Sequence, residues 1–144
     1  MSEDPTADFQ SVFWATKRAM ALASAAAFSR HGIHEGQQYV LHVLWAEDGL
    51  APGEVARRLD LATPTVTRAA LRMEAAGLLR REPDQRDRRL VRLFLTERGR
   101  ALEQVIGDEM DRLSDRALRT LDHMERAALV RALNEIRKNL APRS

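Results

Sequence analysis

The 144-residue sequence contains no cysteine, only two lysines and no long hydrophobic run. The lack of cysteine excludes disulfides, thiolate zinc sites, cysteine nucleophiles and thiol-based redox sensing. Because no run of about 18 apolar residues occurs, we expect no membrane-spanning helix. The first residues are acidic where a secretory signal peptide would be basic and then apolar. We therefore expect a soluble, cytoplasmic protein that forms a single globular domain.

Positive charge is unevenly distributed along a chain whose formal net charge is only +2. Residues 51–100 carry 12 arginines against 7 acidic residues, whereas the rest of the chain is net negative. A localised basic segment indicates contact with a polyanion, since uniform basicity would serve only solubility. A GC-rich coding sequence would explain why these residues are arginines, but not where they lie.

Residues 51–77 have the pattern of a short helix, a tight turn and a second helix that ends at a glycine. Pro52 suits the first position of the short helix. Thr63 is expected to cap the second helix, and Pro64 to occupy its first position. Gly77 supplies the left-handed residue that follows a helix end. The predicted core positions of the second helix include Val66, Leu71 and Met73.

After Gly77 the apolar pattern changes from the period of a helix to that of strands. Residues 78–81 and 90–95 predict two strands. The segment 82–89 is rich in charged and turn-forming residues, which is typical of a hairpin tip. A helix-turn-helix followed by such a hairpin is a winged helix, so the sequence predicts a mainly α fold with a small β-hairpin wing.

Long amphipathic helices are expected at both ends of the chain. Apolar residues recur at three- and four-residue steps over 6–30, 102–121 and 124–140, and a further helix follows Gly32. Thr96 is expected to cap the helix after the second strand. These helices carry more apolar surface than a small central unit can cover, so they should bury it against a second subunit.

The sequence thus predicts an obligate homodimer built from one domain that spans residues 1–144. In this division residues 1–34 and 100–144 form the dimerisation helices. Residues 35–99 form the winged helix-turn-helix.

The second helix of the helix-turn-helix can enter a DNA major groove, about 12 Å wide, while the hairpin reaches the neighbouring minor groove. Threonine can bond phosphates or base edges, and arginine can bind guanine through two hydrogen bonds. A narrow, negatively charged minor groove attracts arginines at a hairpin tip. The predicted DNA-binding residues are Thr63, Thr65, Thr67, Arg68, Arg72, Arg86, Arg88 and Arg89.

Two acidic residues lie within this basic tip. Free carboxylates would be repelled by DNA, so we expect Asp84 and Asp87 to pair with wing arginines and fix their direction. The strand arginines Arg80, Arg81 and Arg92 are expected to contact phosphates or pair with an acidic neighbour, and not to read bases.

Several motifs match a known family in order and spacing. They are Thr65-Val66-Thr67-Arg68, Leu71, Gly77-Leu78, Arg81, Asp84, Arg86-Asp87-Arg88-Arg89 and Leu95-Thr96-Glu97-Arg98-Gly99. With these motifs the sequence resembles the MarR family of winged-helix transcriptional regulators over essentially its whole length. One departure is Ala51, at a position where such proteins often have a capping hydroxyl.

The resemblance implies a homodimer joined through its first and last helices. Such a dimer binds double-stranded DNA at a pseudo-palindromic operator, usually represses transcription and, in a bacterial cytoplasm, associates with the nucleoid when bound. By position, the helix from Thr63 to Arg72 is the recognition helix, and the tip arginines, Arg86 especially, enter the minor groove. A small aromatic or anionic effector would bind where the first, second and fifth helices meet, and Trp14, His42 and Trp45 are the candidates to line that site.

Alternative functions remain open at this point. One is a non-specific architectural DNA-binding protein, and another is a winged helix used for protein interaction. A third is a metal-responsive regulator that uses His31, His34 and His42, although further ligands are hard to find and we expect no metal site. No catalytic motif occurs, so we expect neither an enzyme nor a cofactor.

Overall fold

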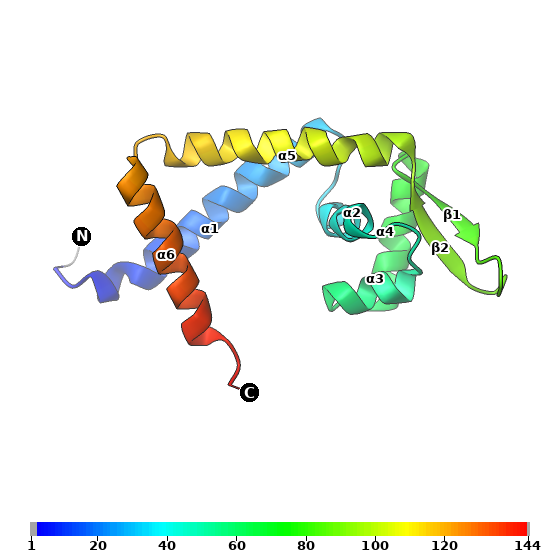
Figure 1. Cartoon of the computed structure of the whole chain (residues 1–144), viewed down its shortest axis with the longest axis horizontal. Coiled ribbons are helices and arrows are strands. Elements are labelled where there is room, and N and C mark those ends of the chain that lie inside the picture. Colours follow the sequence, from blue (N-terminus) through cyan, green and yellow to red (C-terminus); the bar gives the residue numbers. More distant parts are fainter. Residues whose placement is uncertain (1–2, 144) are drawn as a thin grey trace. The chain divides into compact units, whose positions relative to one another are not determined.

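The computed structural model describes residues 3–143 and contains six helices and one two-stranded sheet (Figure 1). The described part of the chain divides into two compact units, the first ending at residue 109 and the second beginning at residue 110. The first unit holds the elements that carry the predicted DNA-binding residues. They are α1 (Pro5–Arg30), α2 (Gln37–Ala46), α3 (Pro52–Leu59), α4 (Thr63–Ala75), β1 (Leu79–Pro83), β2 (Val91–Leu95) and the first part of α5 (Glu97–Leu118). The second unit holds the end of α5 and α6 (His123–Leu140).

A helix-turn-helix forms the centre of the first unit. Pro52 begins α3, as predicted, and Asp60 ends it with a left-handed backbone at φ 54°. Asp tolerates this conformation better than most residues. Gly77, at φ 77°, follows α4 in the same conformation. The fully buried side chains that join these helices to α2 and the sheet include Val40, Leu41, Leu44, Val55, Val66, Ala70, Met73, Leu78, Leu79 and Leu93.

The hairpin wing follows α4 directly and extends away from it (Figure 1). Its strands are antiparallel, with Leu79 opposite Leu95 and Pro83 opposite Val91. An isolated β-bridge between Leu50 and Leu93, and a hydrogen bond from the Leu95 amide to Asp48, join the wing to the loop after α2. The fold is therefore the winged helix that the sequence predicts.

A close junction joins the wing to the start of α5. The Thr96 hydroxyl accepts the amide of Gly99 at 3.1 Å, which is the predicted cap. The Gly99 carbonyl accepts the indole Nε1 of Trp45 at 2.8 Å. A Cβ at Gly99 would overlap the backbone carbonyl of Leu78. The glycine of the Leu-Thr-Glu-x-Gly motif is thus required because two backbone segments meet there.

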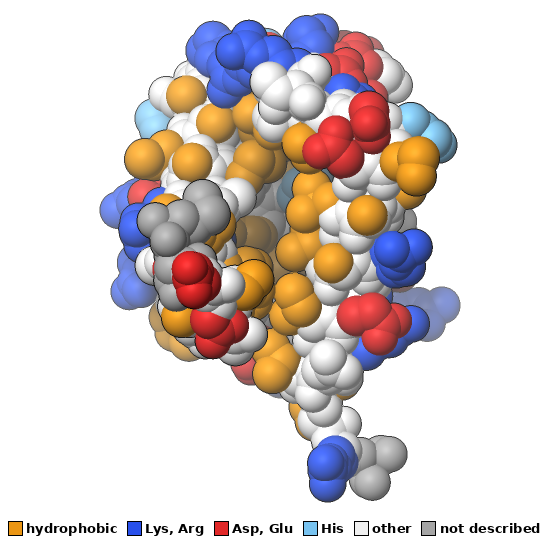
Figure 2. Space-filling view, turned by 90° about the vertical axis from the view of Figure 1, so that its left-hand side faces the viewer, with side chains coloured by type: hydrophobic (Ala, Val, Ile, Leu, Met, Phe, Trp, Pro, Cys, Tyr) orange, Lys and Arg blue, Asp and Glu red, His pale blue; other side chains and the backbone are white. Residues whose placement is uncertain are grey.

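The terminal helices expose large apolar side chains. Within α1, Val12 is 59% and Leu22 73% exposed, and within α6, Val130 is 55% and Leu133 45% exposed. Figure 2 shows hydrophobic side chains, in orange, along the exposed surfaces of the helices that it draws. A capping box that the sequence analysis missed begins α6, where Asp122 and Glu125 each accept the other's backbone amide. No helix among residues 3–143 is long and apolar enough to cross a membrane.

Two local predictions in the helix-turn-helix are wrong. Thr63 does not cap α4, because the amides of Thr65 and Val66 already donate to the carbonyl of Ala62, which makes Thr63 helical. Leu71 is not a core residue, because it is 44% exposed while Val66 and Met73 are buried. Ala51 and Ala62 precede α3 and α4 without any side-chain cap.

The contrast between Gly99 and Gly107 tests the junction. Gly99→Ala should destabilise the protein by about 1–3 kcal/mol, because the new methyl group meets backbone that cannot move freely. Gly107→Ala, also within α5, meets nothing within 4 Å and should stabilise the helix by about 0.5–1 kcal/mol. Chemical denaturation at matched protein concentration measures both. A Gly99→Ala protein as stable as the parent would contradict the close approach.

Candidate nucleic-acid interface

The exposed side of α4 carries the predicted major-groove residues. Thr65, Arg68 and Arg72 are exposed, whereas Thr67 is half-buried and its hydroxyl donates to the Thr63 carbonyl at 3.1 Å. Within the described residues, Arg68 and Arg72 make no side-chain hydrogen bond or ion pair. Both guanidinium groups keep all their donors available to an external acceptor.

The turn between the strands presents the tip arginines. Arg86, Arg88 and Arg89 are all exposed. In the part of the chain that the structure describes, the side chains of Arg86 and Arg88 have no partner. Arg89 instead forms an ion pair with Asp87, with 3.0 Å between Nε and Oδ1. The three predicted tip residues thus differ, because two are unpaired and one is already neutralised.

Asp84 organises the tip. It is a buried carboxylate, 8% exposed, and its Oδ1 accepts the backbone amides of Arg86 at 2.7 Å and Asp87 at 3.0 Å. Its Oδ2 pairs with Arg92 of β2, whose Nη1 donates to the Gly49 carbonyl at 2.9 Å. These contacts, with the Asp87 amide the strongest, lower the pKa of Asp84 from 3.8 to about 2. The carboxylate therefore fixes the turn backbone and connects the wing to the body of the unit.

The strand arginines are neutralised within the chain. Arg80 pairs with Glu82 at 2.6 Å, and Arg81 pairs with Glu74 at 3.1 Å. The hydrogen bonds from Arg81, side chain first and then backbone, lower the pKa of Glu74. The arginines of β1 therefore offer little positive charge that is not already paired with a carboxylate.

The arginines of α3 are also paired. Arg57 and Arg58 both donate to Glu54, and Arg58 also pairs with Glu47. Hydrogen bonds from Arg57 and then Arg58 lower the pKa of Glu54 to about 2, so it stays ionised. Arg98 donates to the Ala76 carbonyl, and Arg100 pairs with Asp48 at 2.9 Å.

The 12 arginines of residues 51–100 thus fall into two groups. Eight hydrogen-bond or pair within the chain, and all but one of these meet a carboxylate. The remaining four have no side-chain partner among the described residues, and they are Arg68, Arg72, Arg86 and Arg88. The sequence pointed to these four residues but gave no means of separating them from the paired Arg89.

A pocket of about 460 Å³ lies between α1 and α2 in the first unit. Its lining includes Phe28, Glu35, Gln38 and His42, and the buried Oε1 atom of Gln38 has no hydrogen-bond partner among residues 3–143. Of the three predicted effector residues, only His42 lines it. Trp45 donates to Gly99, and Trp14 is 47% exposed and donates to Gln10 at 2.7 Å.

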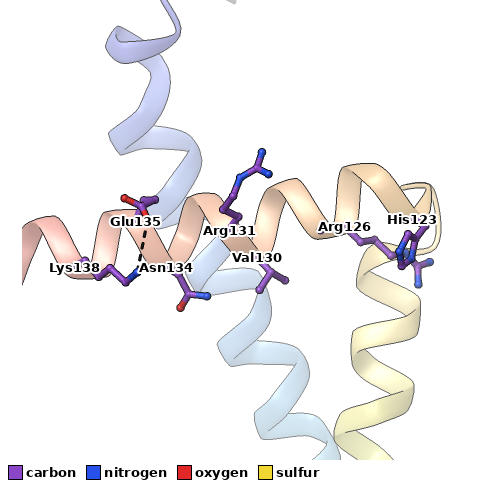
Figure 3. Close-up of a pocket in the computed structure, with 8 residues that line it drawn as sticks. His123, Arg126, Val130, Arg131, Asn134, Glu135 and Lys138 are labelled. Carbon is purple, nitrogen blue, oxygen red and sulfur yellow. Dashed lines mark ion pairs between the residues drawn. The ribbon is translucent and has the colours of Figure 1, made fainter.

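A second pocket in the other unit is lined by α6 alone (Figure 3). It runs from His123 to Lys138, and Lys138 pairs with Glu135 at 3.8 Å. Because one helix surface cannot enclose a ligand, this pocket is an open groove along α6 and not a binding cavity.

The histidines proposed for the metal-responsive alternative do not converge. His31 contacts Glu109 at 3.3 Å between Nε2 and Oε1, and His42 packs edge-to-face on Trp45. His34 is exposed. Across residues 3–143, no three His, Cys, Asp or Glu side chains are placed to hold one ion.

Comparison with known proteins gives the family. A model of the MarR family matches residues 31–90, which include α2, α3, α4 and β1. The transcriptional regulator TtmR of Methylorubrum extorquens is 35% identical over 131 residues, which cover 91% of this chain. The chain belongs to the MarR family. It spans 66% of the length of TtmR, slightly less than two thirds.

Other proteins resemble this MarR-family protein in sequence or in fold. The uncharacterised HTH-type regulator YybA of Bacillus subtilis is 24% identical over 123 residues, which cover 85% of this chain and 82% of the YybA chain. The crystal structure of YusO from Bacillus subtilis has a TM-score of 0.83 at 23% identity, over 96% of this chain and 99% of that one. A MepR variant of Staphylococcus aureus, solved bound to an oligodeoxyribonucleotide, has a TM-score of 0.70 at 22% identity, over 92% and 98% of the two chains.

Acid titration tests the role of Asp84 in the wing. A lowered pKa means that the carboxylate stabilises the folded wing above its ordinary pKa of 3.8, and that this contribution is lost as the pH falls toward about 2. The NMR amide signals of Arg86 and Asp87, which donate to Asp84, should therefore titrate with a midpoint near 2. A midpoint near 3.8 would contradict the network.

Asp84→Asn gives the same test at neutral pH. The neutral amide loses the ion pair with Arg92, so the turn should loosen and trypsin should cut faster after Arg86 and Arg88. The control, Asp111→Asn, changes an exposed α5 residue and should leave that cleavage rate unchanged.

Proposed function

We propose that this protein is a dimeric, sequence-specific regulator of transcription that binds double-stranded DNA. The observation that carries the proposal is the position of the four unpaired arginines. Arg68 and Arg72 lie on the exposed side of α4, and Arg86 and Arg88 lie at the wing tip. Guanidinium groups without an internal partner are available to phosphates and base edges. A paired guanidinium group must first break its ion pair with a carboxylate of the chain.

In the proposed complex, α4 enters the major groove and the wing tip enters the adjacent minor groove. Thr63, Thr65 and Thr67 would contact phosphates or base edges from the start of α4, and Arg68 and Arg72 would contact bases and backbone. Arg86 and Arg88 would enter the minor groove. Arg89, held by Asp87, would direct its charge toward a phosphate instead of a base.

We propose that the functional unit is a homodimer that binds a pseudo-palindromic operator. The exposed apolar side chains of α1 and α6 support this, because so much apolar surface is rarely left in water by a monomer. Two recognition helices in a dimer meet successive major grooves about 34 Å apart. A regulator of this kind acts in the cytoplasm, where the chromosome lies, and would repress when its operator overlaps a promoter.

We further propose that a small molecule relieves DNA binding from the pocket between α1 and α2. The pocket has apolar walls, the imidazole of His42 and the unpartnered Gln38 Oε1, which would accept a hydrogen bond from a ligand. Among the residues that the structure describes, Glu35 lines the pocket and no Lys or Arg does. An aromatic effector with a hydrogen-bond donor therefore suits the site better than the anion that the sequence also allowed.

The main alternative is an architectural protein that binds any duplex. A specific regulator keeps its operator when random competitor DNA is in large excess, whereas an architectural protein does not. Three threonines and two unpaired arginines on one helix favour the specific function, because phosphate neutralisation alone needs no such mixture.

Arg86→Ala tests the minor-groove contact. On an operator selected from a random DNA pool, the substitution should weaken binding by about 1–3 kcal/mol, taking a good base contact as the scale. Arg137→Ala removes the same charge from α6, where Arg137 bonds Asn134 at 3.2 Å, and should leave affinity nearly unchanged. Fluorescence anisotropy titrations measure both variants. Equal affinities for the parent and Arg86→Ala would overturn the assignment of the wing.

Leu133→Glu tests the dimer. The side chain is 45% exposed in the single chain, so a glutamate there should not disturb the chain's own core. It should place charges in the apolar interface, and analytical ultracentrifugation should then show the monomer at concentrations where the parent is a dimer. Leu133→Met keeps the apolar surface and should remain dimeric. A parent protein that sediments as a monomer would contradict the proposed assembly.

A further inference from the structure

Leu71 is an exposed apolar residue in the middle of α4. It is 44% exposed, on a helix whose core positions Val66, Ala70 and Met73 are essentially fully buried. With 3.6 residues per turn, Leu71 lies roughly 60° around the helix from Arg68 and more than about 100° from the buried stripe. Leu71 therefore belongs to the same outward side as the unpaired arginines and takes no part in the core.

The surroundings of Leu71 suit contact with DNA. Arg68 precedes it by one turn and Arg72 follows it directly, and neither has a side-chain partner among the described residues. Ala75, one turn further on, is also exposed and apolar. Glu74 is the acidic residue of α4, and its carboxylate is held by Arg81. This side of α4 thus combines positive charge with an apolar centre and presents no unpaired carboxylate.

The major groove offers one apolar group at its base edges, the C5-methyl of thymine. We propose that Leu71 is a specificity-determining residue that packs against a thymine methyl group in each half-site, between the bases or phosphates bound by Arg68 and Arg72. The inference rests on the proposed DNA-binding function. It assigns sequence preference to a side chain that can form no hydrogen bond.

Replacing each thymine of a selected operator, one at a time, by deoxyuridine tests the contact. Deoxyuridine removes only the methyl group and keeps the base pair. At the thymine that Leu71 contacts, the replacement should weaken binding by the parent protein about fourfold, the value of one buried carbon. Leu71→Ala should bind deoxyuridine and thymine equally at that position and keep the parent's response at every other position.

Leu61→Ala is the matched control. Leu61 has the same 44% exposure but precedes α4, so the variant should retain the parent's fourfold response at the Leu71 position. Thermal unfolding of both variants should match the parent, because neither leucine is buried.

The outcomes separate the two proposals. If the parent binds a selected operator and no thymine shows a response that Leu71→Ala abolishes, the role of Leu71 is overturned while the DNA-binding function stands. The same holds if Leu61→Ala abolishes the response equally. If the parent selects no sequence and binds no duplex, the proposed function itself fails, and the role of Leu71 with it.

Discussion

The pairing of arginines with carboxylates inside the winged helix governs what its surface can do. A basic segment with 12 arginines would bind any polyanion along its whole length if every charge were free. Internal partners occupy most of them, and the unpaired ones are restricted to the exposed side of α4 and the tip of the wing. Positive charge is therefore available at two separate places, which matches a ligand that presents two adjacent grooves.

Asp84 makes the contacts that position the tip of the wing. By accepting two backbone amides of the turn and pairing with Arg92, it determines where the backbone of Arg86 lies, and Arg92 in turn contacts the carbonyl of Gly49. The close approach at Gly99 and the indole of Trp45 hold the other end of the hairpin. Contacts with the rest of the first unit therefore hold the wing at both its tip and its base. They restrict the positions of the backbone that carries the unpaired arginines.

Local signals in the sequence were sufficient to predict the elements of the fold, and they placed the candidate interface on α4 and the wing tip. Gly77, Pro52 and the change of period after α4 predicted the winged helix, and the capping motif at Asp122 and Glu125 was available although it was missed. The internal pairing of several arginines depends on partners distant in sequence, so no local pattern could reveal it. Arg92 donates to the Gly49 carbonyl, and Arg100 pairs with Asp48, so which arginines are paired depends on residues more than 40 positions away. The exposure of Leu71, in contrast, could have been predicted, because Leu71 lies about 140° around the helix from Val66.

Methylation interference tests the central claim most directly, because dimethyl sulfate modifies guanine N7 in the major groove and adenine N3 in the minor groove. An operator bound by α4 and by the wing tip should lose affinity when guanines are methylated in each half-site, and also when adenines are methylated in the minor groove beside it. Interference at both kinds of position, repeated with two-fold symmetry, is the result that we expect. Interference confined to one groove, or to neither, would contradict an interface built from two groups of unpaired arginines.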